Sequence, residues 1–501
     1  MRKFTKNIDL KIKSSADQVK ISFHENSLQF ISVSDKMECG KIVFRRKIDV
    51  NTANSKEMDM LNGGLAGKLI IFAMPLAFSS ILQQLFNSAD VAVVGRFAGD
   101  NALAAVGSCV ALVGIFVNLL VGLSVGPNAA LAMLIGQKDR GKISEMLHTV
   151  MTFGIFLGIG LMITGWLTAR PILELSGTPE SVMKEALLYI DIYFVSIPFM
   201  VIYNFGAAVL RSYGDSRRPM YYLLISGIVN VVLNLVLVIV FSLGVAGVAI
   251  STVISNILSA GLAVIHLYRH DDEFALRADK MRINRHDLAK VLKIGIPAGI
   301  QGAIFSVSNV FIQSGINSFG EYAIAGSSLA LNFEYFTYDI ASAFAQAAVT
   351  FTSQNYGAGN ITRCKKIFGQ CMLFGFVFTE ILSIIFIIWG DFFVSIYTTS
   401  VMVASFALIR MYHVCSLEGL TATYEVASAA LRGMGKSIAP AVFTILGTVV
   451  FRLIWLVTIF KIVPTYDMLM NVYVASWVFT GVSLLIVYFI HMKKVSRTMQ
   501  G

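Results

Sequence analysis

A row of polar side chains interrupts a long apolar stretch of this 501-residue chain. Gln83, Asn87 and Asp90 are spaced i, i+4 and i+7, so a helix places them on one face. A carboxylate in apolar surroundings needs a cation or hydrogen-bond donors, or it takes up a proton and becomes neutral. The row therefore predicts a titratable switch at Asp90, and an acid at the membrane interface held by headgroups or loop amides is the alternative.

The composition places this row inside a membrane. Hydrophobic residues make up 56% of the chain and charged residues 14%, and the mean hydropathy is +0.71. These values are too apolar for a soluble domain of this length. The net charge of +10 does not indicate nucleic-acid binding, because the basic residues lie mainly in short connectors between apolar spans. We expect a multi-pass membrane protein with no nucleic-acid partner.

Windows of about 20 apolar residues, the length that crosses a bilayer, predict twelve helical spans. They lie near 69–94, 104–134, 148–168, 186–209, 221–242, 246–268, 295–318, 323–352, 367–389, 404–430, 438–460 and 468–491. Lys and Arg gather in alternate connectors, a pattern that predicts both termini in the cytoplasm.

Residues 1–57 differ from the rest of the chain, because they are polar and basic and contain no apolar span. We expect either a disordered cytoplasmic extension or a start assigned upstream of the natural one, with Met58 or Met60 as the alternative start. The remaining chain then divides into an N-lobe at 58–270, a cytoplasmic linker at 271–292 and a C-lobe at 293–495.

The two lobes repeat each other in sequence. Pro75 and Pro297 begin similar segments, and an asparagine, Asn87 or Asn309, follows each of them after twelve residues. AAVLRSYGDSRRP at 207–219 likewise corresponds to SAALRGMGKSIAP at 428–440. Because each copy contains six spans, the copies share one orientation, as in transporters built from parallel repeats.

These segments, together with AFAQAAVTFTSQNYGAG at 343–359, resemble the multidrug and toxic compound extrusion (MATE) transporters over about residues 60–495. The resemblance implies an all-α fold of two six-helix lobes in a V shape around a central cavity. It implies export of amphipathic or cationic small molecules across the cell membrane by alternating access, driven by Na⁺ or H⁺. It further implies a protein that is not an enzyme, needs no cofactor beyond the coupling ion and acts as a monomer.

The resemblance also implies site residues. Relatives carry an acid central to ion coupling in the first helix, at Asp90, and Asn230 matches an asparagine of their fifth helix. Asn234 replaces an aspartate there, and Thr252 matches a threonine of their sixth helix. The expected ion-coupling set is Asp90, Asn87, Gln83, Asn230, Asn234 and Thr252. Pro75 is expected to let the first helix bend, although a static kink and plain helix–helix hydrogen bonding are the alternatives.

The second lobe lacks the acid, because Ile312 stands at the position that repeats Asp90. Its own polar residues are candidates for the substrate cavity: Glu334, Asp339, Glu425, Asn309 and Gln313. Pairing of the acids with Arg410 or Arg452 inside the lobe is the alternative interpretation.

Several other functions are excluded or left open. AALRGMGKS at 429–437 has Ala430 where a phosphate-binding loop needs its first glycine, so ATP binding is not expected. The histidines show no metal-ligand spacing, and no Ser/His/Asp pattern is present. A flippase of lipid-linked precursors from the same wider superfamily stays open, as does a channel or sensor that does not pump.

Overall fold

The chain divides into two compact units, Met1–Glu57 and Met58–Gly501. The computed structural model describes residues 58–498 and three strands of the first unit, and leaves residues 1–8, 14–17, 25–26, 34–57 and 499–501 undescribed. The strands β1 (Asp9–Lys13), β2 (Gln18–His24) and β3 (Ser27–Val33) form an antiparallel sheet in that order. Alternating apolar residues such as Val19, Ile21 and Phe23 favour strands, so these segments differ from the disordered extension that we expected. The other residues of this extension lie outside the described residues, and the alternative start at Met58 or Met60 stays a prediction.

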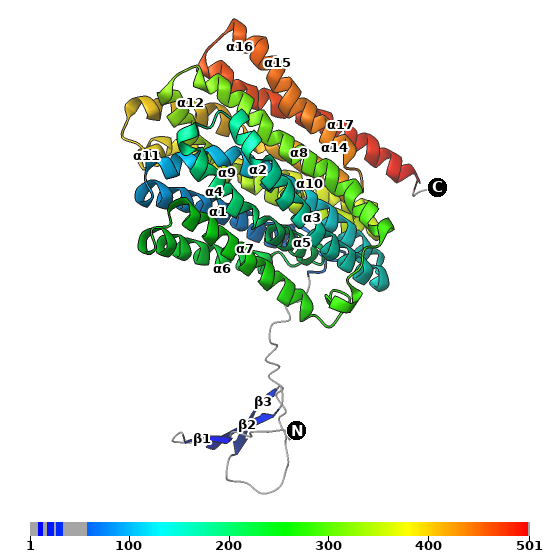
Figure 1. Cartoon of the computed structure of the whole chain (residues 1–501). Helices are drawn as coiled ribbons and strands as arrows, with labels where there is room; N and C mark the ends of the chain where they lie inside the picture. Colours follow the sequence, from blue (N-terminus) through cyan, green and yellow to red (C-terminus); the bar gives the residue numbers. More distant parts are fainter. Residues whose placement is uncertain (1–8, 14–17, 25–26, 34–57, 499–501) are drawn as a thin grey trace. The chain divides into compact units, whose positions relative to one another are not determined.

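The second unit is helical (Figure 1). Its first half contains α1 (Ala66–Phe97), α2 (Asp100–Gln137), α3 (Arg140–Leu175), α4 (Glu180–Phe194), α5 (Ile197–Ser212), α6 (Arg217–Leu235), the π-helical turn η1 (Val236–Val240) and α7 (Gly244–Tyr268). The connector to the second half carries a short 3₁₀ turn, η2 (Ala278–Lys280). The second half contains α8 (Arg285–Asn317), α9 (Glu321–Gly357), α10 (Ile361–Ile388), α11 (Gly390–Ser395), α12 (Val401–Cys415), η3 (Glu418–Leu420), α13 (Thr421–Gly433), α14 (Ile438–Ile445), η4 (Leu446–Val450), α15 (Phe451–Val457), α16 (Ile459–Ile462) and α17 (Tyr466–Thr498).

The helices confirm an all-α membrane fold. Among the described residues, nine helices are long and apolar enough to cross a membrane, or up to eleven if each of two bent helix pairs is one span. At 37 residues α9 is also long. It is not among the nine because it is less apolar, and it carries acids such as Glu334 and Asp339. These helices are consistent with the twelve predicted spans.

Two of the predicted spans, 186–209 and 404–430, are broken rather than straight. The first is α4 and α5, bent by 42°, and the second is α12 and η3–α13, bent by 43°. Pro198 lies in the first turn of α5, where a missing N–H costs no helical hydrogen bond. At the second break the N–H of Gly419 donates to the Glu380 carboxylate of α10 at 2.9 Å, which satisfies a backbone group that no helix uses.

Matching backbone conformations support the internal repeat. Gly99 and Gly320 precede α2 and α9 with φ of 89° and 86°, and Gly214 and Gly435 follow α5 and α13 with φ of 104° and 78°. Only glycine adopts such values without strain, so the same turn chemistry recurs at corresponding points of the two halves.

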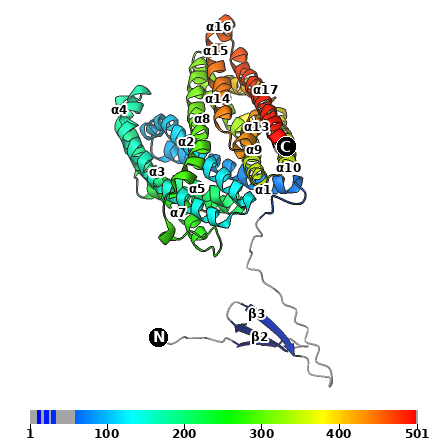
Figure 2. The same ribbon diagram turned by 90° about the vertical axis from the view of Figure 1, so that its right-hand side faces the viewer.

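The two halves have their most extensive contact along α2 and α8. Figure 2 shows these helices between α3 and α4 on one side and α10 and α17 on the other. A Cβ added at Gly122 would lie 2.4 Å from the carbonyl oxygen of Ala298, and one at Gly126 would lie 2.4 Å from that of Val291. Glycines that let two backbones touch are typical of tightly packed membrane helices.

This interface continues to the end of the unit where the Lys/Arg-rich connectors lie, which we call the basic end. There the side chain of Asn128 donates to Thr350 of α9 at 2.9 Å, and Gln354 donates to the carbonyl oxygen of Ser212 at 2.7 Å. A Cβ added at Gly136 would lie 1.9 Å from the carbonyl oxygen of Gln354. The halves are therefore closed against each other at the basic end.

The segment that precedes α1 takes part in this closure. Arg363 of α10 donates to the carbonyl oxygens of Met60 and Asn62 at 3.1 Å and of Gly63 at 2.9 Å. Asn355 of α9 donates to the carbonyl oxygen of Met60 at 3.1 Å, and Met60 itself is 1% exposed. The first helix is thus anchored to the second half.

Replacing Arg363 with Ala is expected to destabilise the protein by about 2 kcal/mol, because one guanidinium donates to three backbone carbonyl oxygens of the segment before α1. Thermal unfolding in detergent measures the loss. Lys365→Ala is the matched control, since Lys365 is exposed on the same helix. Equal unfolding temperatures for the two variants would contradict the anchoring role of Arg363.

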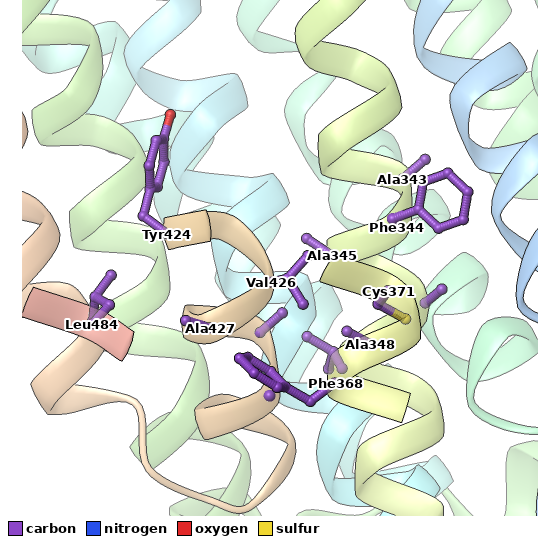
Figure 3. Close-up of a cluster of buried hydrophobic side chains, with 14 of the residues drawn as sticks. Ala343, Phe344, Ala345, Ala348, Phe368, Cys371, Tyr424, Val426, Ala427 and Leu484 are labelled. Atoms are coloured by element: carbon purple, nitrogen blue, oxygen red, sulfur yellow. The ribbon is translucent and has the colours of Figure 1, made fainter. Parts of the chain in front are cut away.

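The core of the second half is built from small residues of α9. Figure 3 shows Ala345 and Ala348 of α9 beside Val426 of α13 and Phe368 of α10, all buried. Alanines allow the neighbouring helices to lie close to α9, which fixes the positions of its acids.

Candidate functional site

Asp90 lies two turns before the end of α1, on the side of the unit away from the basic end. Its carboxylate oxygen Oδ1 accepts a hydrogen bond from Nδ2 of Asn234 in α6. The same Nδ2 lies 3.4 Å from Oδ1 of Asn230, one turn earlier in α6. Asn230 and Asn234 are 5% and 0% exposed. The structure thus brings Asp90, Asn230 and Asn234 together, and we call these three residues the N-lobe polar cluster.

The N-lobe polar cluster offers oxygen atoms rather than cationic partners to its acid. Oδ1 of Asn234 is buried and has no hydrogen-bond partner among the described residues, and no Lys or Arg forms an ion pair with Asp90 there. Carboxylate and amide oxygens are ligands for hard cations, so this donor set fits Na⁺. It equally fits a proton carried on Asp90, which would turn the carboxylate into a donor.

Two tyrosines of α4 belong near this cluster, although the sequence did not predict them. Tyr189 and Tyr193 are buried, and their rings stack at a centroid distance of 6.0 Å. Asp90 acts on both hydroxyl groups through its charge alone, with no hydrogen bond between them among the described residues. Their i, i+4 spacing places them on one helix face. Two tyrosines at this spacing in an apolar span are the sequence signal that could have predicted them.

The other three residues predicted for the ion site, and Pro75, which was predicted to let α1 bend, lie outside the cluster. Gln83 and Asn87 are exposed, and neither forms a side-chain hydrogen bond with a residue that the structure describes. Thr252 donates to the carbonyl oxygen of Val248 in its own helix at 3.1 Å. Pro75 lies within the single helix α1. None of these four residues forms a hydrogen bond to the N-lobe polar cluster among the described residues, and Pro75 lies about four helical turns before Asp90 in α1.

In the second half Glu334 is neutralised by Arg410. Nε of Arg410 lies 2.5 Å from Oε1 of Glu334 and a terminal nitrogen lies 2.8 Å from Oε2. Glu334 and Arg410 are 6% and 2% exposed. Arg410 also donates to Ser327 at 2.5 Å and lies 5.2 Å from the ring centroid of Tyr473. Glu334 was predicted either to line the substrate cavity or to pair with an arginine inside the lobe. The structure shows the pairing.

Replacing Arg410 alone with Met is expected to destabilise the protein by about 3–5 kcal/mol, because it leaves a buried carboxylate without its partner. The double variant Glu334→Gln/Arg410→Met removes both charges and is expected to lose less. Thermal unfolding in detergent compares them. A double variant as unstable as Arg410→Met would contradict the pairing as the source of the effect.

The other cavity candidates are dispersed. Glu425 accepts a hydrogen bond from the Tyr338 hydroxyl at 2.8 Å, and Gln313 donates to Asn317 at 2.9 Å. Asp339 and Asn309 are half-buried and form no side-chain hydrogen bond with a described residue. Ile312, the repeat position of Asp90, is fully buried. The structure does not gather these residues into one site.

Two repeated helical lobes joined along one interface, with Asp90 in one repeat and Ile312 at the matching position of the other, are typical of transporters built from parallel repeats. The MatE family model matches residues 75–236 and 297–458, one copy in each half. The chain therefore belongs to the MatE family, the multidrug and toxic compound extrusion (MATE) transporters. The predicted family and fold class are confirmed.

Curated relatives and solved structures agree with this assignment. The probable multidrug resistance protein YoeA of Bacillus subtilis is 27% identical over 384 residues, which is 75% of this chain and 82% of the relative. The probable multidrug resistance protein YpnP of the same organism is 30% identical over 313 residues, which is 62% of this chain and 69% of the relative. A crystal structure of MATE in complex with MaL6 superposes with a TM-score of 0.83 at 20% identity, covering 88% of this chain and 99% of that one.

Proposed function

We propose that this protein is a multidrug exporter that exchanges amphipathic, often cationic, small molecules for Na⁺ or H⁺. The observation that carries the proposal is the bond between Asp90 of α1 and Asn234 of α6, an acid held by an amide with no basic partner in the described part of the chain. Such a group changes its charge when a cation binds or leaves, and a charge change inside a membrane has a large energetic effect.

The contacts of α1 suggest how this change reaches the rest of the protein. At one end α1 touches α6 through Asp90, and at the other its leading segment is held by Asn355 and Arg363 of the second half. A proton or Na⁺ at Asp90 replaces or alters the bond to Asn234, which shifts α1 relative to α6. We infer that this shift loosens or tightens the closure of the lobes at the basic end, so that the cavity opens to one side and then to the other.

The positive-inside rule places the basic end in the cytoplasm, with the protein in the cell membrane and both termini cytoplasmic. The closed basic end then corresponds to a state that faces outward. We propose a monomer without enzymatic activity and without a cofactor besides the coupling ion.

Ethidium movement in proteoliposomes tests this function. With an inward Na⁺ or H⁺ gradient imposed alone, one of the two is expected to drive ethidium out against its concentration gradient. Ethidium movement that only equalises its concentration on the two sides of the membrane would indicate a channel. Activity on a lipid-linked precursor without ethidium movement would indicate a flippase, and either result would overturn the proposal.

A further inference from the structure

A shallow, open groove on the surface of the first half holds an acid that the proposed transport cycle does not use. It has a volume of about 560 Å³. Its lining comes from α3, α4, the turn after α4, and α7: Trp166, Asp191, Ile192, Val195, Ile250 and Val253. The walls are therefore apolar and aromatic, with a single carboxylate.

The groove opens away from the N-lobe polar cluster. Tyr189 and Tyr193 lie near Asp90, and Asp191, midway between them in sequence, points to the opposite face of α4. Asp191 is exposed, and Trp166 beside it is 43% exposed. Since α3 and α7 are candidate spans and α4 is half of a bent one, this exposed surface faces lipid.

The Asp191 carboxylate has no partner in the part of the chain that the structure describes. Two basic residues of α3 and α4 lie within two helical turns of the groove. Arg170 pairs with Glu174 at 2.9 Å, and Lys184 forms no ion pair with Asp191. An ionised carboxylate beside lipid is costly unless a cation accompanies it.

The break after α4 fixes the aromatic wall of the groove. The N–H of Val195 donates to the carbonyl oxygen of Ile192 at 3.1 Å, so it leaves the carbonyl oxygen of Asp191 free. The indole N–H of Trp166 donates to that oxygen at 2.9 Å. The Trp166 ring is thereby held next to Asp191, and tryptophan is the aromatic side chain that attracts cations most strongly.

We propose that this groove binds lipophilic organic cations from the membrane, with Asp191 pairing the positive charge and Trp166 contacting the aromatic or alkyl body. The chemistry of the walls selects this occupant. A hydrated metal ion gains nothing from apolar walls, and a neutral lipid chain leaves the carboxylate unpaired. The groove is separate from Asp90, so the proposal does not depend on the transport cycle.

The four tryptophans of the chain allow a direct test. In the full-length protein, Trp389, Trp455 and Trp477 are replaced with Phe so that Trp166 alone emits. N-dodecylpyridinium, a lipophilic cation that quenches tryptophan, is titrated into this protein in phosphatidylcholine nanodiscs. We expect saturable quenching that tetraphenylphosphonium reverses and the uncharged triphenylphosphine oxide does not.

Variants separate this site from others. Asp191→Asn is expected to weaken the binding by about five- to tenfold, since the ion pair is partly exposed. Two controls are expected to leave the binding affinity unchanged. Glu180→Gln alters an exposed acid at the start of α4, and Asp90→Asn alters the acid of the N-lobe polar cluster. Unsaturable quenching, or equal affinity with and without the Asp191 charge, would overturn the proposal.

Loss of the quenching when phosphatidylethanolamine is added to the nanodiscs would also overturn it, because a lipid amine would then be the occupant. If the three-phenylalanine variant does not fold, photolabelling of the wild-type protein with an azido lipophilic cation gives a second test. Label on α3 or α4 that decreases in Asp191→Asn supports the site, and label unaffected by that change refutes it.

Discussion

Asp90→Asn is expected to reduce cation-driven efflux to background, at least about tenfold below the wild-type rate. The change preserves the size of the side chain and its place beside Asn234, but it removes the only group of the N-lobe polar cluster that can gain or lose charge. Efflux of ethidium from a pump-deficient host measures the effect, and membrane insertion is expected to stay intact.

Two variants sharpen this result. Glu180→Gln removes an exposed acid at the start of α4 and is expected to export like the wild type. Asp90→Asn/Asn234→Asp moves the carboxylate to the other side of the same hydrogen bond and is expected to recover part of the activity. Unchanged efflux in Asp90→Asn would remove this acid from the mechanism.

Gly136→Val is the second change with a large expected effect. A Cβ at this position would lie 1.9 Å from a backbone oxygen of α9, so the lobes could not close at the basic end as the structure shows. If transport requires that closure, efflux should fall below about one tenth of the wild-type rate, because packed membrane helices cannot accommodate added atoms against backbone.

Gly160→Val is the control for this variant. Gly160 lies in α3, and a Cβ there meets no atom within 4 Å, so insertion of the same side chain into a span is expected to leave efflux unchanged. Wild-type efflux in Gly136→Val would show that the tight approach of α2 and α9 is not part of the cycle.

The sequence predicted some residues of the N-lobe polar cluster, but it also assigned to it residues that lie outside. The depth of Asp90 in an apolar span and the i, i+4 spacing of Asn230 and Asn234 indicated buried polar positions, and the structure brings these three together. Helical spacing also assigned Gln83 and Asn87 to the face of Asp90, but spacing cannot tell which part of a face meets a neighbouring helix. That depends on helix crossing, which is set by long-range packing.

For the fold, too, the features set by local sequence were predicted, and those set by long-range packing were not. Apolar windows and the glycine-containing turns repeated in both halves predicted the helical, two-lobed architecture. The breaks after Phe194 and Cys415 were not predicted, because hydropathy does not change across a bent span. The partner of Glu334 also stayed open, since both Arg410 and Arg452 lie in apolar spans and only packing selects between them.

The central claim is that Asp90 carries the coupling cation. Its most direct test is to follow the cation itself, with a trapped pH dye or radioactive Na⁺, in proteoliposomes that contain wild-type protein or Asp90→Asn. The account predicts that substrate triggers cation movement in the wild type and none in the variant. Equal substrate-dependent cation movement in both would contradict it.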